Sequence, residues 1–225
     1  MSKSFSLPES LSLRDLQVYL SRASRVEDGS VRLIQAAGVL AVYTAILYPR
    51  GLLDSSPTVL GLRTFALTAP VELDAVVPVR SLLDRLARLT AAVLEDEATV
   101  TVTVPLEVTT VTWAGISPPQ GGWTLLGETD AALLDGAAQA GIEEVAAVIP
   151  AGTGGQIVQR VRSEVWSRPI PGLEIVPAGA AFAAVSLGFL PKNEPVRLFE
   201  TGLWTRLSTS RGHILVRRKP WSLSR

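Results

Sequence analysis

The chain has 225 residues, of which 47% are hydrophobic, and its 21 basic and 21 acidic side chains leave no net charge. This length and apolar content indicate a folded protein with one large domain or two smaller ones, and they exclude a disordered chain. The balanced charge excludes a basic field over the whole protein, although residues 206–225 hold six arginines and lysines and no acid.

Two residue types that carry much of enzyme and metal chemistry are scarce. The sequence has no cysteine and a single histidine, His213. Disulfides, thiolate nucleophiles and cysteine zinc sites are excluded, and a zinc centre normally needs several histidine or cysteine ligands. No loop has the acidic spacing of a calcium site. We therefore predict no cofactor and no metal site.

Targeting signals are not evident. The N-terminus, MSKSFSLPES, has no apolar segment of the kind found in signal peptides. The longest apolar runs, Val39–Leu47 and Ala178–Leu190, are shorter than the roughly 20 residues of a membrane-spanning helix. These patterns predict a cytoplasmic protein with no membrane partner.

The N-terminal half begins with residues 1–9, which have no regular pattern and are expected to be frayed. Ser12 is expected to begin a helix, with Asp15 three residues later as a variant of the capping box. Apolar residues of that helix form one stripe: Leu13, Leu16, Leu20 and Ala23. Such a stripe indicates an amphipathic helix packed against a sheet.

Three strands and a second helix are expected next. The strands are Val31–Ala37, Val39–Tyr48 and Thr58–Ala69, and Gly38 marks a bulge or tight bend between the first two. Pro78 suits the first turn of a helix whose leucines repeat on one face.

The clearest strand in the sequence lies within ATVTVTV, residues 98–104. Valines at 100, 102 and 104 alternate with threonines, so the two residue types point to opposite faces of a sheet. Pro105 has no N–H to donate and is expected to interrupt the pairing.

This order of elements resembles one domain of a bacterial DNA sliding clamp. The resemblance covers residues 11–104 and is carried by Val77-Pro78-Val79-Arg80-Ser81-Leu82-Leu83-Asp84, which is similar to the strand-to-helix element of that family. Clamps repeat this domain two or three times in a chain and line a ring with basic residues. No second copy is evident in this sequence, and residues 1–115 carry 10 basic and 12 acidic side chains.

The loop Ile116–Gly122 is the best candidate for a boundary, which predicts domains at 1–115 and 116–225. In the second part, helices are expected at 130–148, 156–166 and 178–187, followed by strands at 196–200, 203–208 and 213–218. Three helices followed by three strands match winged-helix order. The predicted fold class is α+β: a mainly antiparallel sheet with two amphipathic helices, followed by a smaller helical part that ends in a β-hairpin.

A glycine loop is the first candidate site. If residues 144–149 formed a strand, the sequence would read strand, glycine loop, helix, and Gly152, Gly154, Gly155 and Arg160 would bind an anion such as a phosphate. The loop lacks the lysine and serine or threonine of a P-loop. A helical reading of residues 130–148 competes, and the loop would then be a helix–helix connector.

The basic C-terminal segment is the second candidate. Arg206, Arg211, His213, Arg217, Arg218 and Lys219 would contact nucleic acid through a basic hairpin. The third helix, AGAAFAAVSL, offers no side chain that reads bases, which favours a solvated terminus or a protein contact. His213 could act as a general base, because the ordinary pKa of histidine lies near neutrality, but a position at the end of a hairpin favours a structural or exposed residue.

These observations favour an intracellular, non-catalytic binding or assembly module that acts through protein–protein contacts or self-association. The alternatives are a nucleic-acid-associated protein that uses the basic hairpin, and an enzyme that binds a phosphate-bearing ligand at Gly152–Gly155.

Overall fold

The computed structural model describes residues 3–51, 54, 56–92, 98–109, 111–148 and 154–218. The chain divides into two compact units, of which the first comprises Met1–Ala45 and Leu62–Ile116 and the second comprises Ile46–Gly61 and Ser117–Arg225. The predicted α+β class is confirmed, with antiparallel strand pairs and a C-terminal β-hairpin.

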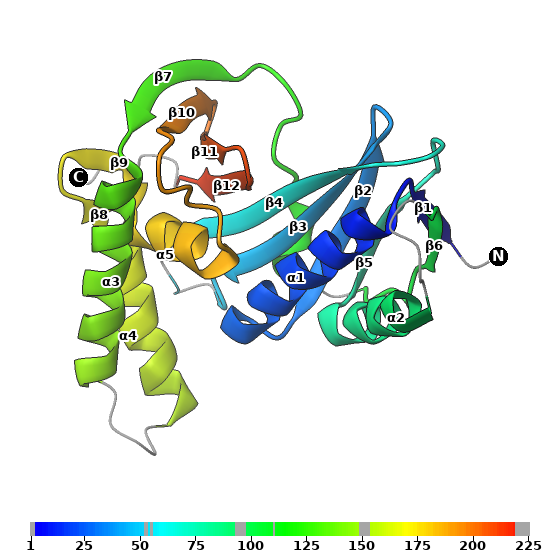
Figure 1. Ribbon diagram of the computed structural model, residues 1–225. Helices are drawn as coiled ribbons and strands as arrows, with labels where there is room; N and C mark the ends of the chain where they lie inside the picture. Colours follow the sequence, from blue (N-terminus) through cyan, green and yellow to red (C-terminus); the bar gives the residue numbers. More distant parts are fainter. Residues whose placement is uncertain are drawn as a thin grey trace. The chain divides into compact units, whose positions relative to one another are not determined.

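The first unit is built from two helices and six strands. In chain order they are β1 (Ser4–Leu7), α1 (Ser10–Val26), β2 (Ser30–Ala36), β3 (Val39–Leu47), β4 (Thr58–Ala66), β5 (Asp74–Pro78), α2 (Val79–Ala92) and β6 (Val100–Thr103), followed by a 3-10 turn at Thr112–Gly115. Strands β3 and β4 also contribute residues to the second unit. The strand order is β5-β2-β3-β4, and α1 and α2 pack side by side beneath it (Figure 1).

Helix α1 begins two residues earlier than the sequence predicts, and its predicted capping box does not form. Glu9 is the N-cap residue and makes no side-chain capping bond, while Ser12 donates its hydroxyl proton to Glu9 Oε1 over 3.3 Å. The predicted apolar stripe is confirmed, because Leu13, Leu16 and Leu20 are fully buried. Burial of this face positions the helix more strongly than its first turn does.

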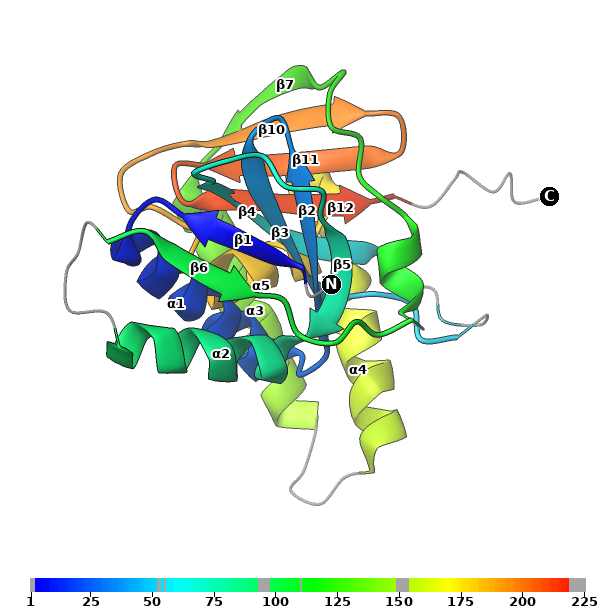
Figure 2. The ribbon, with the colours of Figure 1, turned by 90° about the vertical axis from the view of Figure 1, so that its right-hand side faces the viewer.

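The expectation that residues 1–9 are frayed is wrong for residues 4–7, and Met1 and Ser2 lie outside the described residues. Ser4–Leu7 forms β1 and pairs antiparallel with β6 (Figure 2). Phe5 and Leu7 are buried opposite Val102 and Val100, which confirms that the valines of the alternating strand face the core. The partner strand lies about a hundred residues away in the chain, so no local pattern marks β1.

The second unit contains three helices and six further strands. In chain order they are β7 (Thr124–Thr129), α3 (Ala131–Val148), α4 (Gly155–Ser167), β8 (Pro169–Ile170), β9 (Leu173–Pro177), α5 (Ala178–Leu187), β10 (Val196–Thr201), β11 (Trp204–Thr209) and β12 (Gly212–Arg217). The strand order is β12-β11-β10-β7, and β8 pairs with β9 (Figure 2). The sequence predicted the three helices and the last three strands but not β7, β8 or β9. The winged-helix comparison stays unconfirmed.

The two units share a plan that the sequence reading did not detect. In each, a strand that ends in Val-Pro runs directly into a helix: Val77-Pro78 precedes α2, and Val176-Pro177 precedes α5. In each, the strand before the first helix pairs antiparallel with the strand after the Val-Pro helix, as β1–β6 and as β7–β10. The two units therefore share this order of helices and strand pairs, and they differ in that α4 and the short β8 stand in the second unit where β2, β3 and β4 stand in the first.

No helix among the described residues is long and apolar enough to cross a membrane.

Candidate functional site

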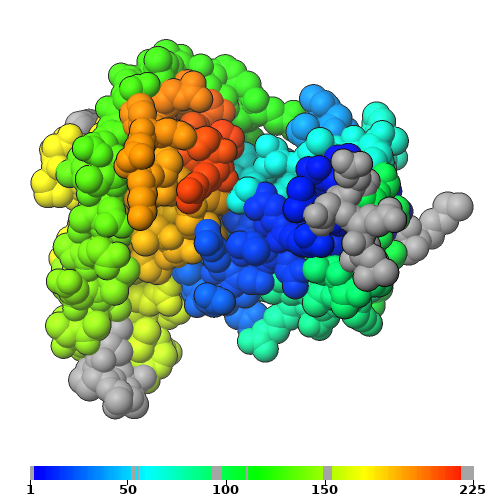
Figure 3. Space-filling view, viewed as in Figure 1, coloured from blue at the N-terminus to red at the C-terminus, as the bar shows by residue number. Residues whose placement is uncertain are grey.

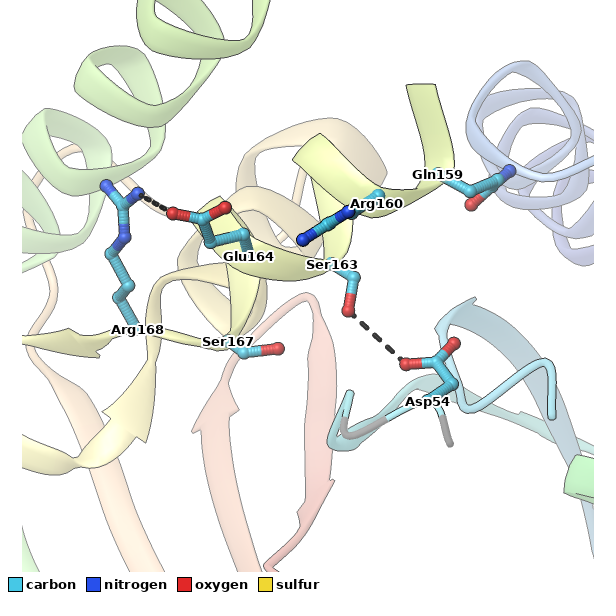
Figure 4. Close-up of a pocket in the computed structure, with 7 residues that line it drawn as sticks. All are labelled: Asp54, Gln159, Arg160, Ser163, Glu164, Ser167 and Arg168. Carbon is cyan, nitrogen blue, oxygen red and sulfur yellow. Dashed lines mark hydrogen bonds and ion pairs between the residues drawn. The ribbon is translucent and has the colours of Figure 1, made fainter. Parts of the chain in front are cut away.

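A pocket of about 620 Å³ lies in the second unit, between α4 and the loop that follows β3. Seven residues line it, six from α4 and the residue after it and one from the loop: Gln159, Arg160, Ser163, Glu164, Ser167, Arg168 and Asp54. Figure 4 shows Ser163 and Asp54 facing one another across its base. The lining is polar, so the protonation and pairing of each group decide what the pocket can do.

The Asp54 carboxylate is already occupied by hydrogen bonds from the protein. Oδ2 accepts from the Arg50 backbone N–H (2.9 Å), and Oδ1 accepts from the N–H and the hydroxyl of Ser56 (2.9 and 2.6 Å) and from the Ser163 hydroxyl (3.3 Å). Burial acts to raise the pKa of Asp54, but these hydrogen bonds together hold it below its usual value. Asp54 is therefore an anchor that fixes the loop on α4, and it is a poor general base.

Two other charged groups of this pocket, Arg168 and Glu164, are paired with one another. Arg168 donates to both oxygens of Glu144 (2.7 and 2.8 Å) and to Glu164 (3.0 Å). These contacts tie α4 to α3. Of the remaining lining, Ser167 Oγ is buried with no partner in the described structure. These contacts hold the loop, α3 and α4 together, and they favour a structural role for the pocket over a catalytic one.

The anion-site prediction at the glycine loop required a strand before the loop, and the structure has a helix there. Residues Glu144–Val148 are helical, so no strand enters the loop, and the connector reading is the one that fits. Gly154 caps α4, Gly155 is its first residue, and Arg160 lies more than a turn along it, in the wall of the Asp54 pocket. Gly152 lies outside the described residues. Anion binding here stays a prediction.

The structure places the residues predicted to contact nucleic acid in different surroundings. Three of its residues, Arg206, His213 and Arg217, point to one face of β11 and β12, because they share the alternation fixed by the strand register. Arg211 lies in the exposed turn between these strands. Arg218 instead contacts Glu200 (3.3 Å) and the Gly202 carbonyl oxygen (3.0 Å). Lys219 lies outside the described residues.

The same face carries an aromatic and cationic group that sequence reasoning missed. The Arg206 guanidinium lies 4.5 Å from the ring centroid of Trp123 and 4.5 Å from that of Phe199, and Arg197 lies 5.9 Å from the Phe199 ring. Arg197-x-Phe199 in a strand was the available signal, since alternate residues share a face. We call this set the arginine face: Trp123, Arg197, Phe199, Arg206, His213 and Arg217.

His213 is not poised for catalysis at neutral pH. Burial lowers its pKa to about 4, and the positive charges of Arg206 and Arg197 act in the same direction. Its Nδ1 lies 2.9 Å from Ser208 Oγ, a side chain that is itself buried. The imidazole is neutral and held in place, which agrees with a structural role.

Comparisons with solved structures identify the fold. The chain is similar to Caulobacter crescentus pol III beta (10% identity, TM-score 0.51, 98% of this chain and 67% of that chain). It is also similar to a putative DNA polymerase III beta subunit from Eubacterium rectale (7% identity, TM-score 0.51, 98% and 66%). A third is a DnaN sliding clamp from Bartonella birtlesii bound to griselimycin (10% identity, TM-score 0.50, 98% and 66%).

The resemblance to a clamp domain is confirmed at the level of fold, and it extends from residues 11–104 to almost the whole chain. The chain spans about two thirds of the length of these clamps. No curated protein matches it in sequence. The family described as a domain of unknown function (DUF8185) matches residues 118–221, and that described as a domain of unknown function (DUF8010) matches residues 1–115. The chain, matched over half its length, therefore belongs to the DUF8010 family.

Proposed function

We propose that this protein is a non-catalytic assembly module that acts through protein–protein contacts, and that it associates with a second copy of itself along β7. One observation carries the proposal: β7 stands at the end of its strand order with both leucines on the surface. Leu125 is 56% exposed and Leu126 is 43% exposed.

An edge strand presents a row of backbone N–H and C=O groups that can pair with another strand. Within the described residues, β7 pairs only with β10. The end strand of the first unit differs, because Val108 donates its N–H to the Val76 carbonyl oxygen of β5 over 2.8 Å. In the space-filling view, the green chain of β7 lies on the surface beside the orange of β10 (Figure 3). We therefore propose that the free edge of β7 pairs with a strand of a second copy of the protein.

The fold supports an assembly role. The similar solved proteins are described as DNA polymerase III beta subunits and sliding clamps. We take from them only the inference that this chain forms or joins an assembly. The two parts of the chain share an order of elements and are matched by two different family models. We therefore also propose that residues 1–115 and 116–225 act as separate parts of that assembly.

The non-catalytic part of the proposal is supported by the Asp54 pocket. Its one carboxylate from the loop accepts four hydrogen bonds, and its arginine at position 168 holds two glutamates. A carboxylate paired in this way is a weak base, and an arginine paired in this way has fewer N–H groups left to donate to a substrate.

The absence of cysteine from the sequence makes the contact directly testable. Single cysteines are introduced by Thr124→Cys, Leu125→Cys and Leu126→Cys, and each variant is mildly oxidised. Facing residues of two paired antiparallel strands have Cα atoms about 4.5–5.5 Å apart, close enough for a disulfide. At least one variant is expected to run as a disulfide-linked dimer on a non-reducing gel.

The control is Ile157→Cys, at a position on α4 that is equally exposed at 58%. It is expected to stay monomeric under the same oxidation. Cross-linking of the Ile157→Cys control to the same extent as the β7 variants would rule out specific pairing along β7.

A further inference from the structure

The arginine face looks away from the helices of its unit. The alternate residues of the same strands form the packed side, where Leu198, Leu207 and Ile214 are buried. A side chain at Gly212, on that packed side, would lie 2.6 Å from the ring of Phe189, the second residue after α5. The arginine face is consequently on the side of β10, β11 and β12 opposite to α5. By register that side also holds Trp204, Ser208 and Leu215, which are buried, so the exposed part of the face is limited to the charged and aromatic side chains named above.

The strand register arranges its three arginines along a diagonal. Arg197 is on β10, Arg206 is on β11 and Arg217 is on β12, and each step moves one strand across and two residues along. With strands about 4.8 Å apart and about 3.4 Å per residue, successive Cα atoms are about 8 Å apart. A line of cations at this interval suits a linear polyanion, because a flexible arginine side chain can adjust to successive phosphate groups.

These arginines have no ion pair with a carboxylate within the described residues, whereas Arg32, Arg63, Arg80, Arg168 and Arg218 each have one. Arg206 Nε is buried without a hydrogen-bond partner. Burial lowers the pKa of Arg206, and the neighbouring positive charge of Arg197 acts in the same direction. One acid, Glu128, lies across from Arg197 on β7 and is exposed.

Aromatic rings accompany the cations. Trp123 and Phe199 flank Arg206, and both rings are only half-buried. Cationic side chains that follow a backbone, with aromatic rings beside them on which bases stack, are the usual composition of surfaces that bind single-stranded nucleic acid without sequence preference. A sheet face does not enter the major groove as a recognition helix does, which disfavours duplex readout.

We propose that the arginine face binds single-stranded nucleic acid, with Arg197, Arg206 and Arg217 on successive phosphates and Trp123 and Phe199 against the bases. This surface is distinct from the β7 edge, and its binding does not depend on self-association.

The test uses the full-length protein and a fluorescein-labelled oligo(dT) of roughly 20 nucleotides, followed by fluorescence anisotropy. Three phosphate contacts give a slope of log affinity against log salt of about −2, so affinity is expected to fall roughly 20-fold between 50 and 200 mM NaCl. The double variant Arg197→Glu/Arg217→Glu is expected to lose at least tenfold in affinity at 50 mM NaCl.

The matched control is Arg88→Glu/Lys192→Glu, which makes the same charge change at exposed positions elsewhere in the chain. It is expected to keep its affinity within about twofold. Circular dichroism melts of both variants establish that they fold. Absence of binding to oligo(dT), or an equal loss in the control, overturns the proposal.

Competition identifies the class of ligand. Unlabelled oligo(dT) is expected to displace the probe, while polyglutamate of equal charge and a duplex of equal length displace it much less. Equal displacement by polyglutamate would assign the face to acidic polypeptides and overturn the nucleic-acid assignment, as would stronger displacement by the duplex.

Discussion

At the scale of single residues, burial and hydrogen bonding determine what the polar side chains of this protein can do. Asp54 lies in the pocket beside α4, where its carboxylate accepts four hydrogen bonds and stays ionised. The single histidine is held neutral beside two arginines. Tyr19 is fully buried and has its hydroxyl 2.9 Å from Thr44 Oγ1, and burial raises its pKa above the usual range. These groups stabilise the fold in one protonation state.

His213 therefore predicts an acid sensitivity of known sign. Its pKa falls from 6.5 to about 4 on folding, so the unfolded chain binds the proton first and stability is lost as pH falls through this window. Between pH 7.5 and 4.5, the loss from this residue is about 2.5 kcal/mol in the free energy of unfolding.

The measurement is urea unfolding of the natural chain and of His213→Gln across that pH range. The natural chain is expected to lose about 2.5 kcal/mol more than the variant, since carboxylate effects are common to both. A difference that stays constant with pH would mean that the histidine has an ordinary pKa in the folded protein.

The two central glycines of α3 predict opposite responses to alanine. A Cβ at Gly136 meets nothing within 4 Å, so Gly136→Ala is expected to stabilise the protein by up to about 1 kcal/mol through helix propensity. A Cβ at Gly141 would lie 2.7 Å from Trp166 Cη2, and that ring is stacked on Phe182 with centroids 4.4 Å apart. Gly141→Ala is expected to destabilise by about 1–3 kcal/mol.

Thermal melts of the two variants decide this pair, because each serves as the control of the other. Two stabilising substitutions would show that α3 can move away from Trp166 at little cost. The sequence indicated only that both glycines weaken the helix; which of them is needed depends on a residue 25 positions later in the chain.

At the scale of elements, periodic patterns in the sequence predicted which residues of a strand are buried, but, apart from the C-terminal hairpin, the sequence did not predict which strands pair with one another. Val100 and Val102 are buried while Thr101 and Thr103 are exposed, as their alternation predicts. Strand β1 has too few residues for a periodic pattern to mark it, and the hydrogen bond between Ser6 Oγ and Thr101 Oγ1 (2.8 Å) joins residues 95 positions apart. Strand β7 is not marked by its sequence, because TLLGET does not alternate; its adjacent leucines point to opposite faces of the strand and both are exposed.

The pairing of β1 predicts that the first residues of the chain are needed for stability. Phe5 is 1% exposed, so Phe5→Ala is expected to cost about 3–5 kcal/mol. The neighbouring Ser4 is exposed on the other side of the strand, and Ser4→Ala is expected to change stability by less than about 0.5 kcal/mol. Urea denaturation measures the free energy of unfolding of both variants. A loss for Phe5→Ala as small as that for Ser4→Ala would mean that residues 4–7 do not pack as β1 in solution.

At the scale of the whole molecule, one plan occurs twice. The sequence showed this order in the first unit through Val77-Pro78 and the leucines of α2, but the second unit has only Val176-Pro177 before an alanine-rich helix. Alanine and glycine in α5 permit close packing on α3 without leaving an amphipathic pattern. The shared order is therefore evident from the pairing of the strands and not from the spacing of residues in the sequence. The same holds for the arginine face, whose residues are brought together by the register of β10, β11 and β12.

The central claim is that the exposed β7 edge makes this protein assemble with itself. Sedimentation equilibrium at micromolar concentrations tests it most directly, with the natural chain compared with Leu125→Lys/Leu126→Lys and with Leu133→Lys/Ile157→Lys, which adds the same charge at exposed helix positions. The account predicts that the natural chain and the helix variant sediment at twice the 23.9 kDa chain mass or more, and the β7 variant at the chain mass. A natural chain that sediments as a monomer, or a β7 variant that assembles as well as the natural chain, would contradict it.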